Sequence, residues 1–217
     1  DGWARERVAP RRDIHDTPAR MRGLEASMGR GAGHPLEADA VALGEQILRD
    51  WSAWSGPLDL PERTCHGDLK ISNLRFHATR DEALCLLDLD TVGPMDLSCE
   101  LGDAWRSWCN PAGEDDPDAA RFDVEIFEAS ARGFLSTAPP LTAGERAGLV
   151  SGIERICLEL AGRFCGDALD NSYFKEDRAR FAQPGAHNLH RARCQLALAR
   201  SARAARAACE RILALTG

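Results

Sequence analysis

The sequence predicts a mainly α-helical fold that carries one small β-hairpin. Apolar residues recur at the 3.6-residue period of a helix over most of the 217 residues, whereas strand-like runs occur only within 74–89. Strands do not alternate with helices along the chain, and no segment repeats at a fixed period. These two observations exclude the doubly wound α/β and solenoid classes. The length suffices for one sizeable domain or two small ones.

Each expected element has its own sequence signal. Residues 1–37 are rich in Arg, Gly and Pro and predict loop with a short helix. Apolar positions at helical spacing predict a helix over 38–54, which a Gly-Pro pair ends. Two short apolar runs, 74–78 and 83–89, flank a polar tetrapeptide and predict the hairpin. Further helices are expected over 101–108, 122–135, 142–166 and 190–215, the third of them beginning with a capping box.

The composition is that of an ordinary soluble protein, with 44% hydrophobic and 28% charged residues. No stretch approaches the ~18 uninterrupted apolar residues of a membrane span, and no secretory signal pattern follows Asp1. The net charge of −7 is opposite in sign to that of a general nucleic-acid binder. The eight cysteines form no C-x-x-C pair, so we expect reduced, mostly buried thiols. We therefore expect a cytoplasmic protein that binds neither nucleic acid nor membrane.

The segment 65–73, C-H-G-D-L-K-I-S-N, and the strand-end Asp88 together hold the residue types of a phosphoryl-transfer site. Such a reaction needs a carboxylate that orients the attacking hydroxyl and accepts its proton, and oxygen ligands that hold Mg²⁺ against the phosphates. Asp68 suits the first role. Asn73 and Asp88 suit the second, and Lys70 supplies a point charge for the transferring phosphoryl group.

The pattern H-x-D-L-K-x-x-N followed by a strand-end Asp resembles the catalytic and metal loops of the protein-kinase-like phosphotransferases. Gly67 and the D-L-D at 88–90 are similar to the aminoglycoside phosphotransferase and choline kinase branch, which acts on small molecules. Over about 65–198 the chain resembles the N-acetylhexosamine 1-kinases, which phosphorylate the anomeric hydroxyl of the sugar. The segments that carry this likeness are 88–92, 102–106, 173–175 and 187–193.

The resemblance implies a role for each matching residue. Asp68 would be the base, Lys70 would contact the γ-phosphate of ATP, and Asn73 and Asp88 would bind Mg²⁺, with Asp90 as a second acidic group near the metal. His66 would anchor the catalytic loop. Residues outside the common core that would line the acceptor pocket are Arg106, Tyr173, His187, Arg191 and Arg193.

The chain departs from these sugar kinases at two places. They carry Asp where this chain has Glu100, so the hydrogen bond that pins the catalytic loop is expected from Glu100 or, if displaced, from Asp103. The order Gly-Pro-Met at 93–95 also differs from their usual Met-Pro-Gly, which affects acceptor specificity.

Kinases of this type also need an N-terminal lobe, whose sheet, flexible loop and lysine hold the nucleotide phosphates. Residues 1–64 contain no lysine and no run of strands. We therefore expect 1–64 to be a helical and loop lead-in and 65–217 to be the catalytic C-lobe of an α+β two-lobe fold whose N-lobe is absent. That N-lobe and a small-molecule acceptor, a sugar in the leading interpretation, are the expected partners.

Three alternatives remain open. An aminoglycoside, choline or homoserine kinase would be of the same class, and its cationic acceptors would require an acidic pocket. The acidic run at 114–118 is interpreted as a solvated loop instead. The motif at 86–91 also resembles the nucleophile of haloacid-dehalogenase-type phosphatases, a fold that needs parallel strands. The third alternative is a catalytically incomplete, pseudokinase-like lobe.

Overall fold

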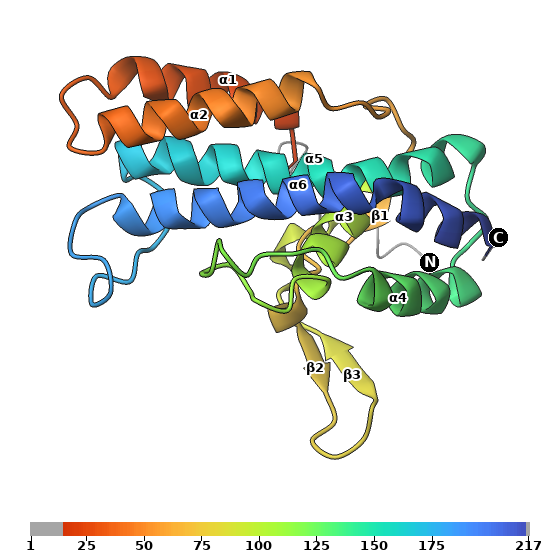
Figure 1. Ribbon diagram of the computed structural model, residues 1–217. Coiled ribbons are helices and arrows are strands. Elements are labelled where there is room, and N and C mark those ends of the chain that lie inside the picture. Colours follow the sequence, from red (N-terminus) through yellow and green to blue (C-terminus); the bar gives the residue numbers. More distant parts are fainter. Residues whose placement is uncertain (1–14, 216–217) are drawn as a thin grey trace.

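The centre of the fold is a pair of long helices, α5 (Ala143–Asp170) and α6 (Ala186–Leu215), which lie side by side (Figure 1). The computed structural model describes residues 15–215 of the chain. Helices α1 (Thr17–Arg30) and α2 (Glu37–Ser52) pack along one side of α5. Together these four helices bury the larger part of the hydrophobic core.

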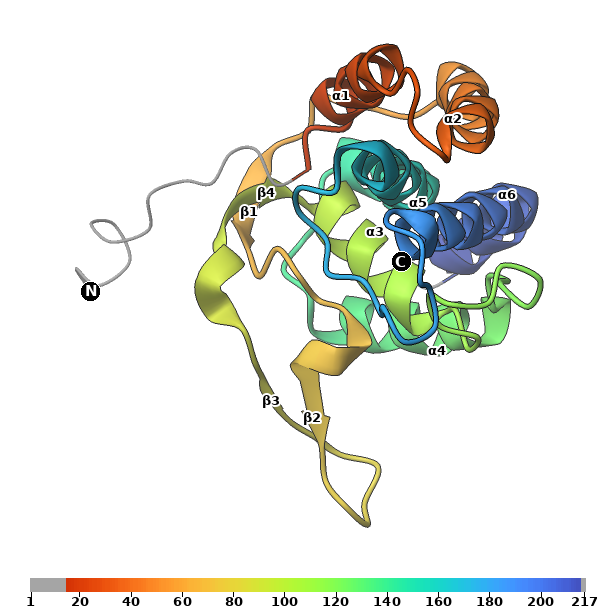
Figure 2. The same ribbon diagram turned by 90° about the vertical axis from the view of Figure 1, so that its left-hand side faces the viewer.

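Helices α3 (Leu97–Trp108) and α4 (Val124–Thr137) lie on the other side of the central pair (Figure 2). Helix α3 packs against α5, and α4 packs against α6. The predicted mainly helical fold with a small hairpin is therefore confirmed. None of the helices between Thr17 and Leu215 combines the length and the apolar content that are needed to cross a membrane.

Four helices differ clearly from the prediction. Helices α3 and α6 begin four residues earlier than expected, at Leu97 and Ala186, and α1 and α5 are longer than expected. Helix α1 has 14 residues, where loop and a short helix were predicted; the Asp16 side chain caps it by accepting the N–H of Ala19 at 2.9 Å. Helix α5 continues past Gly166 to Asp170, because this glycine does not end the helix but lets Ser27 of α1 approach closely. The helix ends at Asn171, whose left-handed backbone forms the C-cap.

The predicted hairpin is confirmed: β2 (Leu74–Phe76) pairs antiparallel with β3 (Ala83–Leu86), and it protrudes from the helical body (Figure 2). A second pair, β1 (Glu62–Cys65) with β4 (Gly93–Asp96), was not predicted. These strands have only four residues each, lack alternation, and in β4 include a proline, so they give no strand signal. The pair is important because β1 leads directly into the catalytic segment and β4 leads into α3.

Helices α3 and α5 cross at glycines. A side chain at Gly152 would overlap the carbonyl oxygen of Ser98, and one at Gly102 would overlap the backbone of Gly152. The backbones therefore approach more closely than any larger residue would allow. This crossing fixes the position of α3, which carries several residues of the candidate site.

The predicted boundary between 64 and 65 falls inside β1, and both helices before it pack against α5. The eight cysteines are all free, and all except Cys85 are buried. The prediction of mostly buried thiols that pack as small apolar groups is therefore confirmed.

Candidate active site

The segment 65–73, the expected catalytic loop, makes a sharp turn at Gly67. Its φ of +83° is in the left-handed region, and a Cβ at this position would lie 2.7 Å from the carbonyl oxygen of Thr91. Only glycine satisfies both conditions. The Thr91 hydroxyl also donates a hydrogen bond to the carbonyl oxygen of His66 at 2.8 Å. The turn is therefore held tightly against the segment that carries Asp88 and Asp90.

The Glu100 carboxylate, on α3, fixes the same turn from the other side. Its two oxygens accept the backbone N–H groups of His66 and Gly67, each at 2.8 Å. Burial raises the pKa of the Glu100 carboxyl, and these two donors only partly offset that effect. The longer side chain of Glu100 thus makes both bonds itself, and Asp103 pairs with Arg106 instead.

His66 joins this turn to the segment 88–90, which carries the expected metal ligand Asp88 and is called the metal segment below. Its Nδ1 accepts the N–H of Asp68 at 3.3 Å, so the neutral ring carries its hydrogen on Nε2. That Nε2 donates to the carbonyl oxygen of Leu87 at 2.9 Å. The N–H of Leu87 in turn donates to the carbonyl oxygen of Asn73 at 2.9 Å. Asp88, the next residue, is therefore held beside the catalytic loop.

One oxygen of the Asp68 carboxylate is held by two partners. Its Oδ2 lies 2.5 Å from Lys70 Nζ and accepts a hydrogen bond from Asn73 Nδ2 at 2.9 Å. Asn73 Nδ2 also donates to the Asp68 carbonyl oxygen at 2.8 Å. No donor within residues 15–215 bonds the second oxygen, Oδ1. This oxygen is free to accept a hydrogen bond from an incoming hydroxyl.

Asp88 and Asn73 offer oxygen atoms that suit Mg²⁺. Asp88 is exposed and has φ 61° and ψ 64°, a left-handed conformation that costs energy for a residue with a side chain. Asn73 uses its amide nitrogen for Asp68, which leaves its amide oxygen for a metal. Asp90 is also exposed, in the short turn that follows. No three His, Cys, Asp or Glu side chains within 15–215 are arranged to hold a metal, so a cation here would keep ligands from phosphate and water.

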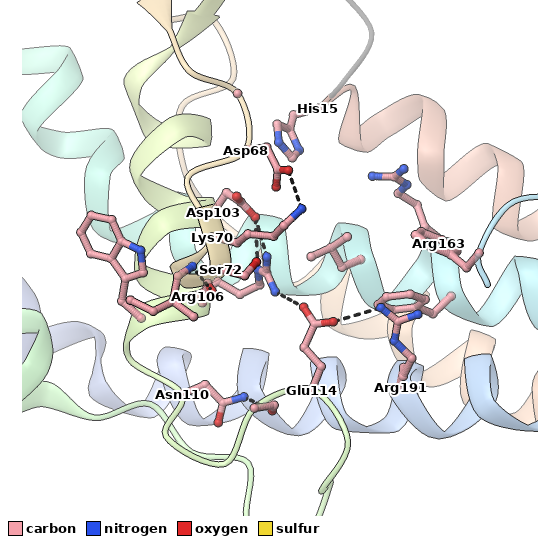
Figure 3. Close-up of a pocket in the computed structure, with 18 of the residues that line it drawn as sticks. His15, Asp68, Lys70, Ser72, Asp103, Arg106, Asn110, Glu114, Arg163 and Arg191 are labelled. Atoms are coloured by element: carbon pink, nitrogen blue, oxygen red, sulfur yellow. Dashed lines mark hydrogen bonds and ion pairs between the residues drawn. The ribbon is translucent and has the colours of Figure 1, made fainter. Parts of the chain in front are cut away.

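A cavity of about 770 Å³ opens beside Asp68 (Figure 3). One wall is formed by the catalytic loop and α3, and the other by α5, the loop after it and the start of α6. The charged and aromatic residues that line it are His15, Asp68, Lys70, Asp103, Arg106, Trp108, Glu114, Arg163, Phe164, Tyr173, Phe174 and Arg191.

A chain of ion pairs crosses the floor of this cavity (Figure 3). Arg106 is buried and pairs with Asp103 at 2.7 Å and with Glu114 at 2.5 Å; Arg191 reaches the other oxygen of Glu114 at 3.0 Å. Although burial opposes its charge, Asp103 and Glu114 raise the pKa of Arg106. Burial alone would raise the pKa of Glu114, but the two guanidinium groups hold it below its usual range.

The interpretation of 114–118 as a solvated loop is therefore wrong for Glu114. Its partners are on α3 and on α6, 8 and 77 residues away in the sequence. An isolated run of acidic residues contains no signal for such pairing, so the sequence could not show that one of its carboxylates enters the cavity.

Aromatic rings form the wall opposite the catalytic loop. The Arg191 guanidinium lies 3.9 Å from the centre of the Phe164 ring. Phe164 packs against Phe174, and Tyr173 packs against Phe174 edge-on. The Asp167 carboxylate fixes this loop by accepting the N–H groups of Ser172, Tyr173 and Phe174.

The structure brings Arg106, Tyr173 and Arg191 to the cavity, but it places the other two expected pocket residues elsewhere. His187 bonds Asp115 at 2.9 Å through Nε2, and its ring stacks on Phe181, so it links two loops. Arg193 reaches Asp39 of α2 at 3.4 Å.

Helix geometry explains why Arg193 lies outside the cavity. Residues that are two positions apart in an α-helix are separated by about 200° around its axis. With Arg191 facing the cavity, Arg193 therefore points to the opposite side.

The sequence did not reveal the cavity residues on the wall opposite the catalytic loop, which we call the distant wall. Arg163 and Phe164 lie on a helix whose pattern indicates only core packing, and His15 lies in a segment without periodicity. Trp108 ends a helix that the sequence predicts, but nothing in the sequence shows that its indole N–H donates to the carbonyl oxygen of Leu69 at 2.8 Å and supports the loop that carries Asp68.

A carboxylate with one oxygen open to a hydroxyl, and further carboxylate and amide oxygens nearby, has the groups that a phosphoryl-transfer site needs. The chain belongs to the phosphotransferase enzyme family (APH), whose family model matches residues 4–139, well over half of the sequence. Residues 4–14 of this match lie outside the described part. The match includes the catalytic loop, the metal segment and α3, but ends before α5 and α6, which form the distant wall.

Proposed function

We propose that the chain is the catalytic and acceptor-binding part of a small-molecule kinase that uses Mg²⁺ and ATP. Its acceptor is a sugar hydroxyl, such as the 1-hydroxyl of an N-acetylhexosamine. The observation that carries this proposal is the Asp68 carboxylate, which has one oxygen held by Lys70 and Asn73 and the other open, beside a cavity of about 770 Å³.

In the proposed reaction, Asp68 Oδ1 accepts a hydrogen bond from the acceptor hydroxyl and orients its oxygen toward the γ-phosphorus of ATP. The hydroxyl proton passes to Asp68 as the new O–P bond forms and the bond to the leaving ADP breaks. Lys70 stabilises charge on the transferring group. Asn73 and Asp88 would hold Mg²⁺, which neutralises charge on the phosphate oxygens.

The charges of the cavity favour a sugar over a cationic acceptor. Each carboxylate in the lining is paired with a basic side chain: Asp68 with Lys70, and Asp103 and Glu114 with Arg106. An aminoglycoside or choline would need a carboxylate without such a partner. The planar donors and aromatic rings of the lining suit the hydroxyls and ring faces of a sugar instead.

The nucleotide is expected to need a further cover. Within 15–215 the only sheets are two antiparallel pairs of two strands, which also argues against the dehalogenase-type fold and its parallel sheet. Apolar residues on and beside the hairpin are strongly exposed next to the metal segment, namely Ile71, Phe76, Leu84, Leu86 and Leu89. We propose that a nucleotide-binding lobe covers this surface, because soluble proteins rarely leave such a patch open.

ADP release with Mg-ATP tests the function directly. The compounds to be assayed as acceptors are N-acetylglucosamine, N-acetylgalactosamine, homoserine, choline and kanamycin. With the proposed nucleotide-binding lobe present, we expect turnover with the hexosamines, its loss in Asp68→Asn, and no change in Glu125→Gln on the exposed side of α4. Turnover with kanamycin or choline alone would reject the sugar assignment. Sugar binding by calorimetry without any turnover would support the pseudokinase-like alternative, and absence of both would reject the proposal.

A further inference from the structure

Arg163 is a basic residue of the cavity wall that has no carboxylate partner. It lies four residues after Glu159 on α5, the spacing at which Glu and Arg usually pair on a helix. The Glu159 carboxylate is buried and engaged elsewhere: it accepts hydrogen bonds from His15 Nδ1 at 2.9 Å and from the Thr17 hydroxyl at 2.6 Å. Within residues 15–215, Arg163 makes no hydrogen bond or ion pair.

The partners of Glu159 favour its ionised form. Burial alone would raise the pKa of Glu159, but the His15 hydrogen bond and charge, together with Thr17 and the more distant Arg163, hold it below its usual range. Its charge is thus satisfied mainly on the side of α1, which leaves the donor groups of Arg163 directed toward the cavity.

Aromatic rings hold the Arg163 guanidinium in place. It lies 5.5 Å from the centre of the Tyr173 ring and 5.3 Å from that of Phe174. Asp167 fixes both rings by accepting their backbone N–H groups at 2.9 and 2.8 Å. Figure 3 shows the guanidinium pointing from α5 into the cavity, toward the side where Asp68 and Lys70 lie. Little side-chain freedom would therefore be lost when a ligand binds it.

The lining has more positive than negative charge. Its three carboxylates are those of Asp68, Asp103 and Glu114, and its permanent cations are those of Lys70, Arg106, Arg163 and Arg191. The carboxylates are paired with the other three cations, so the charge of Arg163 is the excess. Its N–H groups are donors only. A ligand that completes this lining supplies acceptor oxygens and a negative charge.

We propose that Arg163 is an anion-binding residue of the acceptor pocket, and that the acceptor carries an acidic group in addition to its reacting hydroxyl. This inference rests on the proposed kinase function and narrows its substrate class from sugars to acidic sugars. The group is a carboxylate or a phosphate monoester, because the guanidinium fork binds two oxygens of either.

Two matched pairs of acceptors test this inference: glucose with glucuronate, and N-acetylglucosamine with its 6-phosphate. Calorimetry measures the binding of each sugar to the full chain and to Arg163→Gln. Steady-state assays with Mg-ATP give kcat and KM for both proteins. Arg132→Gln, an exposed arginine of α4 paired only with Glu128, is the control. A thermal melt of each variant verifies folding.

We expect the unaltered protein to bind at least one acidic sugar more tightly than its neutral partner. Arg163→Gln should weaken that binding about 10- to 100-fold, as expected for a hydrogen bond to a charged group. The loss should occur in KM with kcat nearly unchanged, because the guanidinium makes none of the contacts that hold the Asp68 carboxylate. Arg163→Lys keeps the positive charge but lacks the two-pronged guanidinium, so it should recover part of the lost binding. Preference for glucuronate indicates a carboxylate, and preference for the 6-phosphate indicates a phosphate.

Any one of several results would overturn the inference. The first is equal binding of acidic and neutral partners, and the second is an equal effect of Arg163→Gln on both. The third is a rise in KM for Mg-ATP alone, which would assign the guanidinium to the nucleotide. Turnover of neutral sugars only would reject this inference and leave the kinase function intact, whereas absence of binding and turnover with all four sugars would reject both.

Discussion

The Glu100 carboxylate accepts the backbone N–H of Gly67 at 2.8 Å, so that helix α3 directly holds the turn that carries the proposed base. Glu100→Gln places an amide N–H₂ group against one of two backbone donors. We expect a loss of about 1–3 kcal/mol in the free energy of unfolding and a lower kcat, since Asp68 shifts with the turn. Urea unfolding and steady-state kinetics measure both, with the exposed Glu125→Gln as control. Unchanged kcat in a folded variant would contradict this role.

Asp88 has a left-handed backbone, and two substitutions separate its backbone from its carboxylate. Asn tolerates this conformation, whereas Ala does not, so Asp88→Ala should be less stable than Asp88→Asn by roughly 1 kcal/mol. Both should lose most activity, because both remove the metal-binding charge. Urea unfolding compares the stabilities, and the Mg²⁺ dependence of kcat compares the activities. Full activity in Asp88→Asn would remove Asp88 from the metal site.

Gly152 and Gly133 are both helical glycines, but only the first is at a helix crossing. A methyl group at Gly152 overlaps the Ser98 carbonyl oxygen, whereas one at Gly133 meets nothing within 4 Å. Gly152→Ala should therefore destabilise the fold by about 1–3 kcal/mol or more. Gly133→Ala should stabilise it by about 0.5–1 kcal/mol, since alanine favours the helix. Thermal and urea unfolding measure both, and two changes of the same sign would contradict the close crossing.

Arg63 forms a two-fold hydrogen-bonded ion pair with Glu145, at 2.5 and 2.9 Å, between β1 and the start of α5. This hydrogen bond lowers the pKa of the Glu145 carboxyl from 4.5 to about 2. Because the folded pKa lies below the unfolded one, the stabilisation is complete above about 4.5 and is lost as the pH falls toward 2.

Removing the arginine tests this pH dependence. Arg63→Gln should shift the acid-unfolding midpoint, followed by circular dichroism, to higher pH. Arg49→Gln, which removes an exposed helical pair with Glu45, should leave that midpoint nearly unchanged. A midpoint that does not move in Arg63→Gln would show that other carboxylates control acid unfolding.

The sequence predicted most helices well because each buries one face, so that its apolar residues recur at the helical period. The proposed catalytic residues were also recognisable, since Asp68, Lys70 and Asn73 lie within six residues of one another and their chemistry is local. The β1–β4 pair was not, because its strands are short and meet only through long-range pairing. No local pattern indicates such a contact.

The distant wall of the cavity was unpredictable for a related reason. Whether Glu114 is solvated or paired depends on where α3 and α6 place Arg106 and Arg191. Among the residues that the structure describes, Arg163 has no ion-pair partner, because Glu159 is engaged by His15, about 150 positions earlier in the sequence, and by Thr17. Both features result from tertiary packing, which periodicity and spacing do not encode.

The loop between α5 and α6 is fixed at its start by a single side chain, that of Asp167, which binds three consecutive backbone N–H groups. It contributes Tyr173 and Phe174 to the cavity but makes none of the bonds that hold Asp68. If the proposed function holds, a change in this loop would alter the acceptor pocket without touching the groups that hold Asp68. A library of sequences exchanged after Asp167 could therefore diversify the range of acceptors, in evolution or in the laboratory, while the machinery of transfer is inherited unchanged.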